Sequence, residues 1–148
     1  MRVAATCLLL IVSCAVSHAA TCAVPGAINQ AVTQDNIKDT ICKPGWTATV
    51  RPPEEYTEAL KRRLIQQRNP SASAQSINAT MKSTELDHCI PLELGGNPRS
   101  EKNLWLQPWN GSCGAHAKDK LENSLRRDVC AGRKTLAQAR VAVMQWCL

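Results

Sequence analysis

The chain contains no phenylalanine and few aromatic residues of any kind. Its aromatic side chains are those of four tryptophans and one tyrosine, 3% of the 148 residues. Proteins that bind single-stranded nucleic acid by stacking successive bases need several exposed aromatic side chains. The composition therefore argues against a base-stacking platform rich in exposed aromatics.

Long apolar segments are also lacking. The apolar run "VAATCLLLIVSCAV" follows Arg2 and is too short to cross a bilayer, and no later segment could cross one. Ser17 and Ala19 have the small-residue spacing that a signal peptidase accepts. We therefore expect residues 1–19 to be a signal peptide. Residues 20–148 are then a single exported domain without a membrane segment, secreted or extracellular, or periplasmic in a bacterium.

The cysteine content is high for a chain of this size. Two of the eight cysteines lie in the expected signal peptide. Six cysteines in a small exported domain indicate three disulfides, for which fifteen pairings are possible. The six are Cys22, Cys42, Cys89, Cys113, Cys130 and Cys147.

The charge balance is moderately basic. The formal net charge is +6, and removal of the signal peptide with its arginine lowers it by one. A charge of this size is compatible with a polyanionic partner, and equally with solubility alone.

The periodicity of apolar residues predicts an α+β domain with a β-hairpin between helices. Turn-rich segments surround these elements, and residues 51–56 should be extended. In chain order we expect a helix at 57–68, a loop at 69–84, strands at 86–94 and 103–107, a helix at 116–130, and a helix from 135 to the C-terminus. The last helix should begin with a capping box formed by Thr135 and Gln138.

One face of the helix at 116–130 concentrates polar side chains. Residues three, four and seven positions apart share a helix face. This spacing groups His116, Asp119 and Asn123, with Lys120 and Arg127 on the same side. The opposite side carries Leu121, Leu125 and Val129 and should face the core.

These residue types suit the hydrolysis of a phosphodiester. Such a reaction needs a divalent cation held by carboxylate, amide or imidazole groups. It also needs a base with a pKa near neutrality, usually a histidine, and a group that fixes the imidazole tautomer. Asp87 and His88 at the end of the first strand, and Asn103 at the start of the second, supply candidates.

Three segments resemble the HNH endonucleases, whose ββα-metal fold consists of a hairpin followed by a helix. They are "LDHCIPLELGG", "NLWLQPWNG" and "HAKDKLENSLRRDVCAG", and the upstream segment from residue 41 is similar to small exported proteins of this type. The resemblance implies a disulfide-stapled α+β fold with a ββα-metal core and flanking helices. It also implies a Cys42–Cys130 disulfide.

The resemblance further implies a role for each motif residue. His88 is the expected general base, Asp87 a metal ligand, and Asn103 the group that orients His88. The helix ligand is expected to be His116 or Asp119 first and Asn123 next. Glu122 comes last because we expect it to point away from that face. The implied cofactor is one divalent ion, Mg²⁺ before Mn²⁺ or Zn²⁺.

The implied activity is cleavage of DNA or RNA by a monomer with little sequence preference. Lys120 and Arg127 are expected to contact the phosphate backbone, whereas Arg126 belongs to a solvated face.

Other interpretations use the same residues. His88, Asn103 and Asp119 each have an ordinary structural role open to them, and the domain may be a catalytically silent module that binds nucleic acid or protein, or a structural secreted effector. A zinc site made of His88, Cys89, Cys113 and His116 is disfavoured in an oxidising compartment. A catalytic Cys89 thiolate paired with His88 is disfavoured because adjacent residues on a strand point to opposite faces. Asn78 and Asn110 each begin a glycosylation sequon.

Overall fold

The structure is a computed structural model that describes residues 22–147. The expected signal peptide lies outside the described residues. Within them the chain forms a mixed α+β domain with a two-stranded antiparallel sheet. The elements in chain order are α1 (Trp46–Val50), α2 (Glu54–Arg68), α3 (Ala74–Ser83), β1 (Thr84–His88), a 3-10 turn η1 (Leu92–Leu94), β2 (Leu104–Pro108), α4 (Ala115–Cys130) and α5 (Leu136–Met144).

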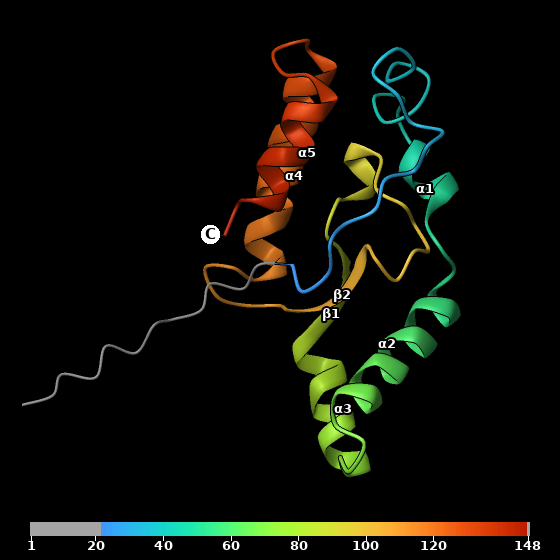
Figure 1. Cartoon of the computed structure of the whole chain (residues 1–148), viewed down its shortest axis with the longest axis vertical. Coiled ribbons are helices and arrows are strands. Elements are labelled where there is room, and N and C mark those ends of the chain that lie inside the picture. The colour runs from blue at the N-terminus through green and yellow to red at the C-terminus, as the bar shows by residue number, and fades with distance from the viewer. Residues whose placement is uncertain (1–21, 148) are drawn as a thin grey trace, which may run out of the picture.

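The molecule is elongated, with a helix pair at each end and the hairpin between them (Figure 1). Helices α4 and α5 contact each other at one end, and α2 contacts α3 at the other. The hairpin contacts α2 and α3, while η1 in the loop after β1 contacts α4. Residues at the end of β1 are thus placed between the two helix pairs.

The predicted hairpin is confirmed, although its first strand is shorter than expected. In the antiparallel register Asp87 pairs with Trp105 and His88 pairs with Leu104. Strand β1 ends at His88 rather than continuing to residue 94. The chain instead turns into η1 after Pro91, which has no N–H to donate to a strand ladder.

The two C-terminal helices are close to the predictions. Leu125 and Val129 of α4 are buried, and Thr135 and Gln138 form the predicted capping box of α5. These helices pack with the N-terminal segment and the loop after β1 around one apolar core. Its buried members are Val32, Ile41, Ile90, Leu94, Leu125, Val129, Leu136, Ala139 and Val143.

The prediction of a loop at 69–84 is wrong, because most of this segment forms α3. Ser73 caps the helix by accepting a hydrogen bond from the backbone N–H of Ser76 at 3.2 Å. Only Ile77 and Met81, one turn apart, pack into the smaller apolar cluster against α2 and the sheet. A segment with only two apolar contacts shows little helical periodicity in its sequence. Its helical structure therefore depends mainly on tertiary packing. Helix α2 likewise begins at Glu54, within the segment expected to be extended.

The six cysteines form three disulfides, as the count predicts. The pairs are Cys22–Cys89, Cys42–Cys130 and Cys113–Cys147. The expected Cys42–Cys130 bridge is confirmed. Because Cys89 and Cys113 are both oxidised, neither the zinc site nor the Cys89 thiolate is present. In the described part of the chain no helix has the length and apolar character needed to cross a membrane.

Candidate functional site at the end of the hairpin

Two adjoining cavities open where β1 ends beside α4. The larger has a volume of about 410 Å³ and the smaller about 220 Å³. Arg51, Glu85, Leu86 and His88 line both of them. The imidazole therefore lies at the boundary between a larger, half-apolar space and a smaller, strongly polar one.

His88 is held as a neutral base. Its Nε2 is 3.2 Å from the backbone oxygen of Pro98, which can only accept a hydrogen bond. Nε2 therefore carries the proton in the neutral ring, and Nδ1 keeps its lone pair. Burial lowers the pKa of His88, and Arg51 and Lys118 lower it further, against the Pro98 hydrogen bond and Asp87, which raise it. The site thus favours an unprotonated imidazole.

Asp87 is tied to a fully buried lysine of α4. Its Oδ1 accepts the backbone N–H of His88 at 2.7 Å, and its Oδ2 accepts from Nζ of Lys118 at 2.7 Å. The same ammonium donates to the backbone oxygen of His88 at 2.7 Å and to the carboxylate of Glu122. Burial alone would lower the pKa of Lys118, but Asp87 and Glu122 raise it, so the ammonium stays charged. Lys118 therefore holds the backbone at Asp87 and His88 in place.

Asn103 acts on the loop between the strands and not on the His88 side chain. Its Oδ1 accepts the N–H of Ile90 at 2.9 Å, and its Nδ2 donates to the oxygens of Ile90 and Asn97 at 2.9 and 3.0 Å. Asn97 is the neighbour of Pro98, whose carbonyl orients the imidazole. Asn103 therefore fixes the loop that carries Pro98 and does not contact the imidazole, where direct contact was expected.

Helix α4 brings some of the predicted ligands to Asp87 and not others. Asp119, Glu122 and Asn123 line the smaller cavity together with Asp87. The expectation that Glu122 points away is wrong, because its carboxylate reaches inward to Lys118. His116 does not line either cavity. Its ring stacks on Trp109, with a centroid distance of 5.3 Å.

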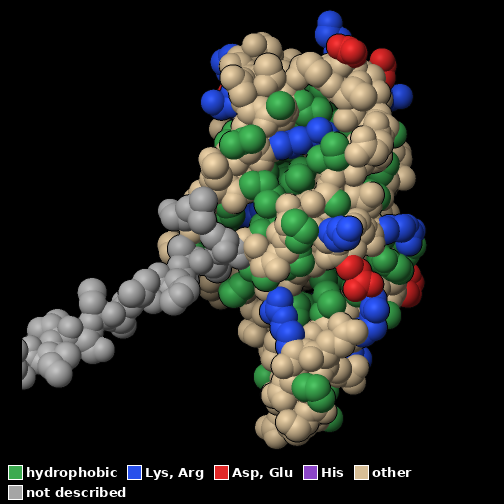
Figure 2. Space-filling view, viewed as in Figure 1, with side chains coloured by type: hydrophobic (Ala, Val, Ile, Leu, Met, Phe, Trp, Pro, Cys, Tyr) green, Lys and Arg blue, Asp and Glu red, His purple; other side chains and the backbone are tan. Residues whose placement is uncertain are grey.

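The predicted phosphate contacts lie outside both cavities. Lys120 and Arg127 are exposed on α4 and are absent from the lining of either cavity. Arg126, expected to be solvated, donates to the backbone oxygen of Ile41 at 2.7 Å. Figure 2 shows Lys and Arg side chains scattered over one face of the molecule with Asp and Glu among them, without a continuous basic stripe.

The smaller cavity carries an excess of carboxylates. Burial raises the pKa of Glu85 to about 7, with Asp87 and Asp119 adding to the shift. Burial likewise raises the pKa of Glu122 to about 7. Carboxylate oxygens are the donors that suit a cation such as Mg²⁺, which binds through one or two carboxylates and keeps several waters. In the described range, no group of three or more His, Cys, Asp or Glu side chains could hold a metal by itself.

Three residues of this site, Arg51, Glu85 and Lys118, were not predicted from the sequence. The i,i+4 spacing of Lys118 and Glu122 was the available signal for the buried ion pair. Glu85 lies two positions before Asp87 on β1, so the alternation of the strand places both on one face. Arg51 carries no such signal, because it reaches the site from a distant turn before α2.

Comparison with known proteins adds no assignment. No protein-family model matches the chain, and neither curated proteins nor solved structures gave a match.

Proposed function

We propose that this protein is an exported, metal-dependent endonuclease of the HNH type, with β1, β2 and α4 as its ββα-metal core. The observation that carries the proposal is the state of His88. Its tautomer is set by Pro98, its pKa is lowered, and it faces a polar cavity beside Asp87. An oriented neutral imidazole is what a hydrolase needs to take a proton from water.

In the proposed reaction, Nδ1 of His88 removes a proton from a water molecule. The water oxygen attacks phosphorus, the bond from phosphorus to the leaving oxygen breaks, and that oxygen takes a proton from solvent. The Arg51 backbone N–H donates to the backbone oxygen of Thr47, but its side chain makes no hydrogen bond or salt bridge within residues 22–147, so the guanidinium is free to hold a phosphoryl oxygen.

Asp87, Asp119 and Asn123 are the residues that would hold a divalent ion, which supplies charge stabilisation at the phosphoryl group. Mg²⁺ is the first choice, with Mn²⁺ and Zn²⁺ as alternatives. His116 is not part of this proposed set because its ring stacks on Trp109 away from the smaller cavity. Three disulfides suit an exported protein.

The test is cleavage of plasmid DNA and of RNA by the purified protein, with Mg²⁺ and then with EDTA. We expect cleavage that EDTA abolishes. His88→Ala should lower the rate by about 10² to 10⁴, the usual contribution of a general base. Because His88 is buried, His88→Asn is a second variant that keeps a polar side chain, and circular dichroism should confirm that both fold. A folded His88 variant with full activity would disprove the assignment.

One observation favours the alternative, a silent module that binds nucleic acid on the same scaffold. Both oxygens of Asp87 already accept hydrogen bonds, from His88 N–H and from Lys118. Such a module would retard nucleic acid in a salt-sensitive way and show no metal-dependent cleavage.

A further inference from the structure

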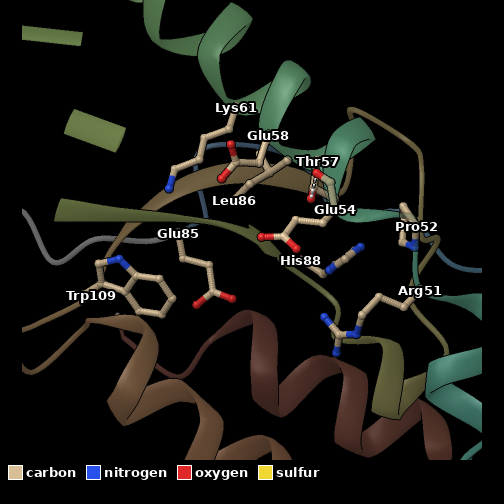
Figure 3. A pocket seen from close by; sticks show the side chains of 10 residues that line it. All are labelled: Arg51, Pro52, Glu54, Thr57, Glu58, Lys61, Glu85, Leu86, His88 and Trp109. Carbon is tan, nitrogen blue, oxygen red and sulfur yellow. Dashed lines mark hydrogen bonds between the residues drawn. The ribbon is translucent and has the colours of Figure 1, made fainter. Parts of the chain in front are cut away.

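The larger cavity has the size of a small-molecule site. Its volume of about 410 Å³ lies in the range of ligand pockets. Figure 3 shows side chains from α2, from β1 and from the loop after β2 around this space, with His88 between them. The cavity is therefore larger than a phosphate group requires.

Three apolar side chains line the cavity, those of Pro52, Leu86 and Trp109. Trp109 and Pro52 lie at opposite ends of the space in Figure 3. The ring of His116 stacks on Trp109 at 28° between planes, and His116 itself does not line the cavity. Trp109 thus stacks on His116 and also lines the cavity. A single indole can stack one planar ring.

The polar lining of the cavity combines three carboxyl groups with Arg51, Thr57, Lys61 and His88. Glu54, Glu58 and Glu85 point toward the space in Figure 3. Lys61 also lines it, but its ammonium already donates to the backbone oxygens of Met81 and Thr84 at 2.7 and 2.6 Å. The carboxylates would repel a phosphate group. They would accept from a neutral ring that carries N–H donors on its edge.

The boundary between the two cavities is suited to a phosphate group. Arg51 and His88 belong to both linings, and Arg51 is the cation there without a partner among residues 22–147. A nucleotide whose phosphate lies at His88 therefore has the larger cavity open to its base.

We propose that the larger cavity binds a guanine base of an unpaired nucleotide, next to the phosphate attacked at His88. Guanine is the base whose pairing edge carries two adjacent N–H donors, at N1 and N2, which one carboxylate can accept together. A base in a duplex is paired and stacked, so it must leave the helix to enter. The substrate class is then single-stranded nucleic acid with preferred cleavage beside guanine. This inference rests on the proposed nuclease function.

The first experiment measures binding in EDTA, so that it does not depend on activity. The probes are labelled oligothymidylates with one central guanine, inosine, 7-deazaguanine or thymine, followed by fluorescence anisotropy. Inosine lacks the N2 donors, whereas 7-deazaguanine keeps the whole pairing edge. We expect the guanine and 7-deazaguanine probes to bind at least about fivefold more tightly than the other two, the lower end for a bidentate contact. Equal affinities, or no binding of any probe, would overturn the inference.

Two variants locate the contact. Glu58→Gln should remove most of the difference between guanine and inosine. Glu55→Gln is the matched control, because Glu55 lies on the same helix, is exposed and does not line the cavity. Trp109→Ala should weaken binding of all probes, and Trp109→Phe should restore part of it. A guanine preference that survives both Glu58→Gln and Trp109→Ala would place the base elsewhere and overturn the proposal.

The second experiment maps cleavage with Mg²⁺ present. We expect cuts beside guanine in single strands, and slower cleavage of the same sequence in a duplex. Cleavage that ignores both base and strandedness would refute the base pocket while leaving the nuclease intact. Guanine-selective binding without any cleavage would support the pocket and refute the nuclease.

Discussion

Lys118 offers the sharpest test of how this site is held together. The residue is fully buried, and its ammonium donates to Asp87, to the His88 backbone oxygen and to Glu122. Lys118→Met keeps an unbranched apolar stem one atom shorter than that of lysine and removes the charge. The variant leaves two carboxylates, whose side chains are 16% and 12% exposed, without their shared cation.

The expected cost follows from that burial. Removing one partner of a buried ion pair typically costs about 3–5 kcal/mol, because the remaining charge is left unpaired. A domain of this kind has roughly 5–15 kcal/mol of stability in total. Lys118→Met should therefore lose a large fraction of the free energy of unfolding. Equilibrium urea unfolding followed by tryptophan fluorescence, with the disulfides intact, measures it.

The control and the pH dependence make the test specific. Lys120→Met, exposed on the same helix, should change stability by no more than about 0.5 kcal/mol. The pKa of Glu122 is about 7 with Lys118 present, and loss of this cation raises it further, so the stability deficit should shrink as pH falls through about 7. Adding Glu122→Gln should recover part of the loss. A cost below about 1 kcal/mol that does not vary with pH would refute the buried-cation account.

Three further outcomes are expected. Because the pKa of His88 is lowered, the acid limb of the pH profile for kcat/KM should lie below the ordinary value of 6.5, and a limb above that value would contradict the environment described. Asn103→Ala leaves buried backbone groups of Ile90 without partners, so it should cost at least about 2 kcal/mol in urea unfolding, and an unchanged midpoint would refute that role. Gly96→Ala places a methyl group against the backbone oxygen of Ile90, so it should lower stability by about 1–3 kcal/mol in thermal unfolding, and neutrality would show that the loop can shift.

Local patterns in the sequence predict the hairpin and the two C-terminal helices well. The apolar residues of α4 recur at helical spacing, and the capping box at Thr135 is a contiguous signal. Helix α3 was missed because its apolar pattern is short and its stability comes from packing on α2. Periodicity reports the face that an element buries, so an element with a narrow buried face gives little signal.

The residues of the candidate site likewise fall into those that the sequence predicts and those that it does not. Asp87, His88 and the polar face of α4 are visible in the sequence because each belongs to a compact segment. The roles of Lys118, Glu122 and His116 were not visible there. The helical period of 3.6 residues shows which side chains share a helix face. It does not show how much of the helix circumference is buried against the core.

The sequence by itself determined the hairpin, the two C-terminal helices, the even set of six cysteines and the acid–imidazole pair at the end of β1, because these depend on neighbours along the chain. Only the tertiary structure decided that Lys118 is buried between two carboxylates, that Asn103 holds a loop rather than the imidazole, and that Arg51 and Trp109 reach the cavities. These contacts join segments far apart in the chain. Their existence depends on how α2 and α4 pack against the hairpin, which no local pattern records.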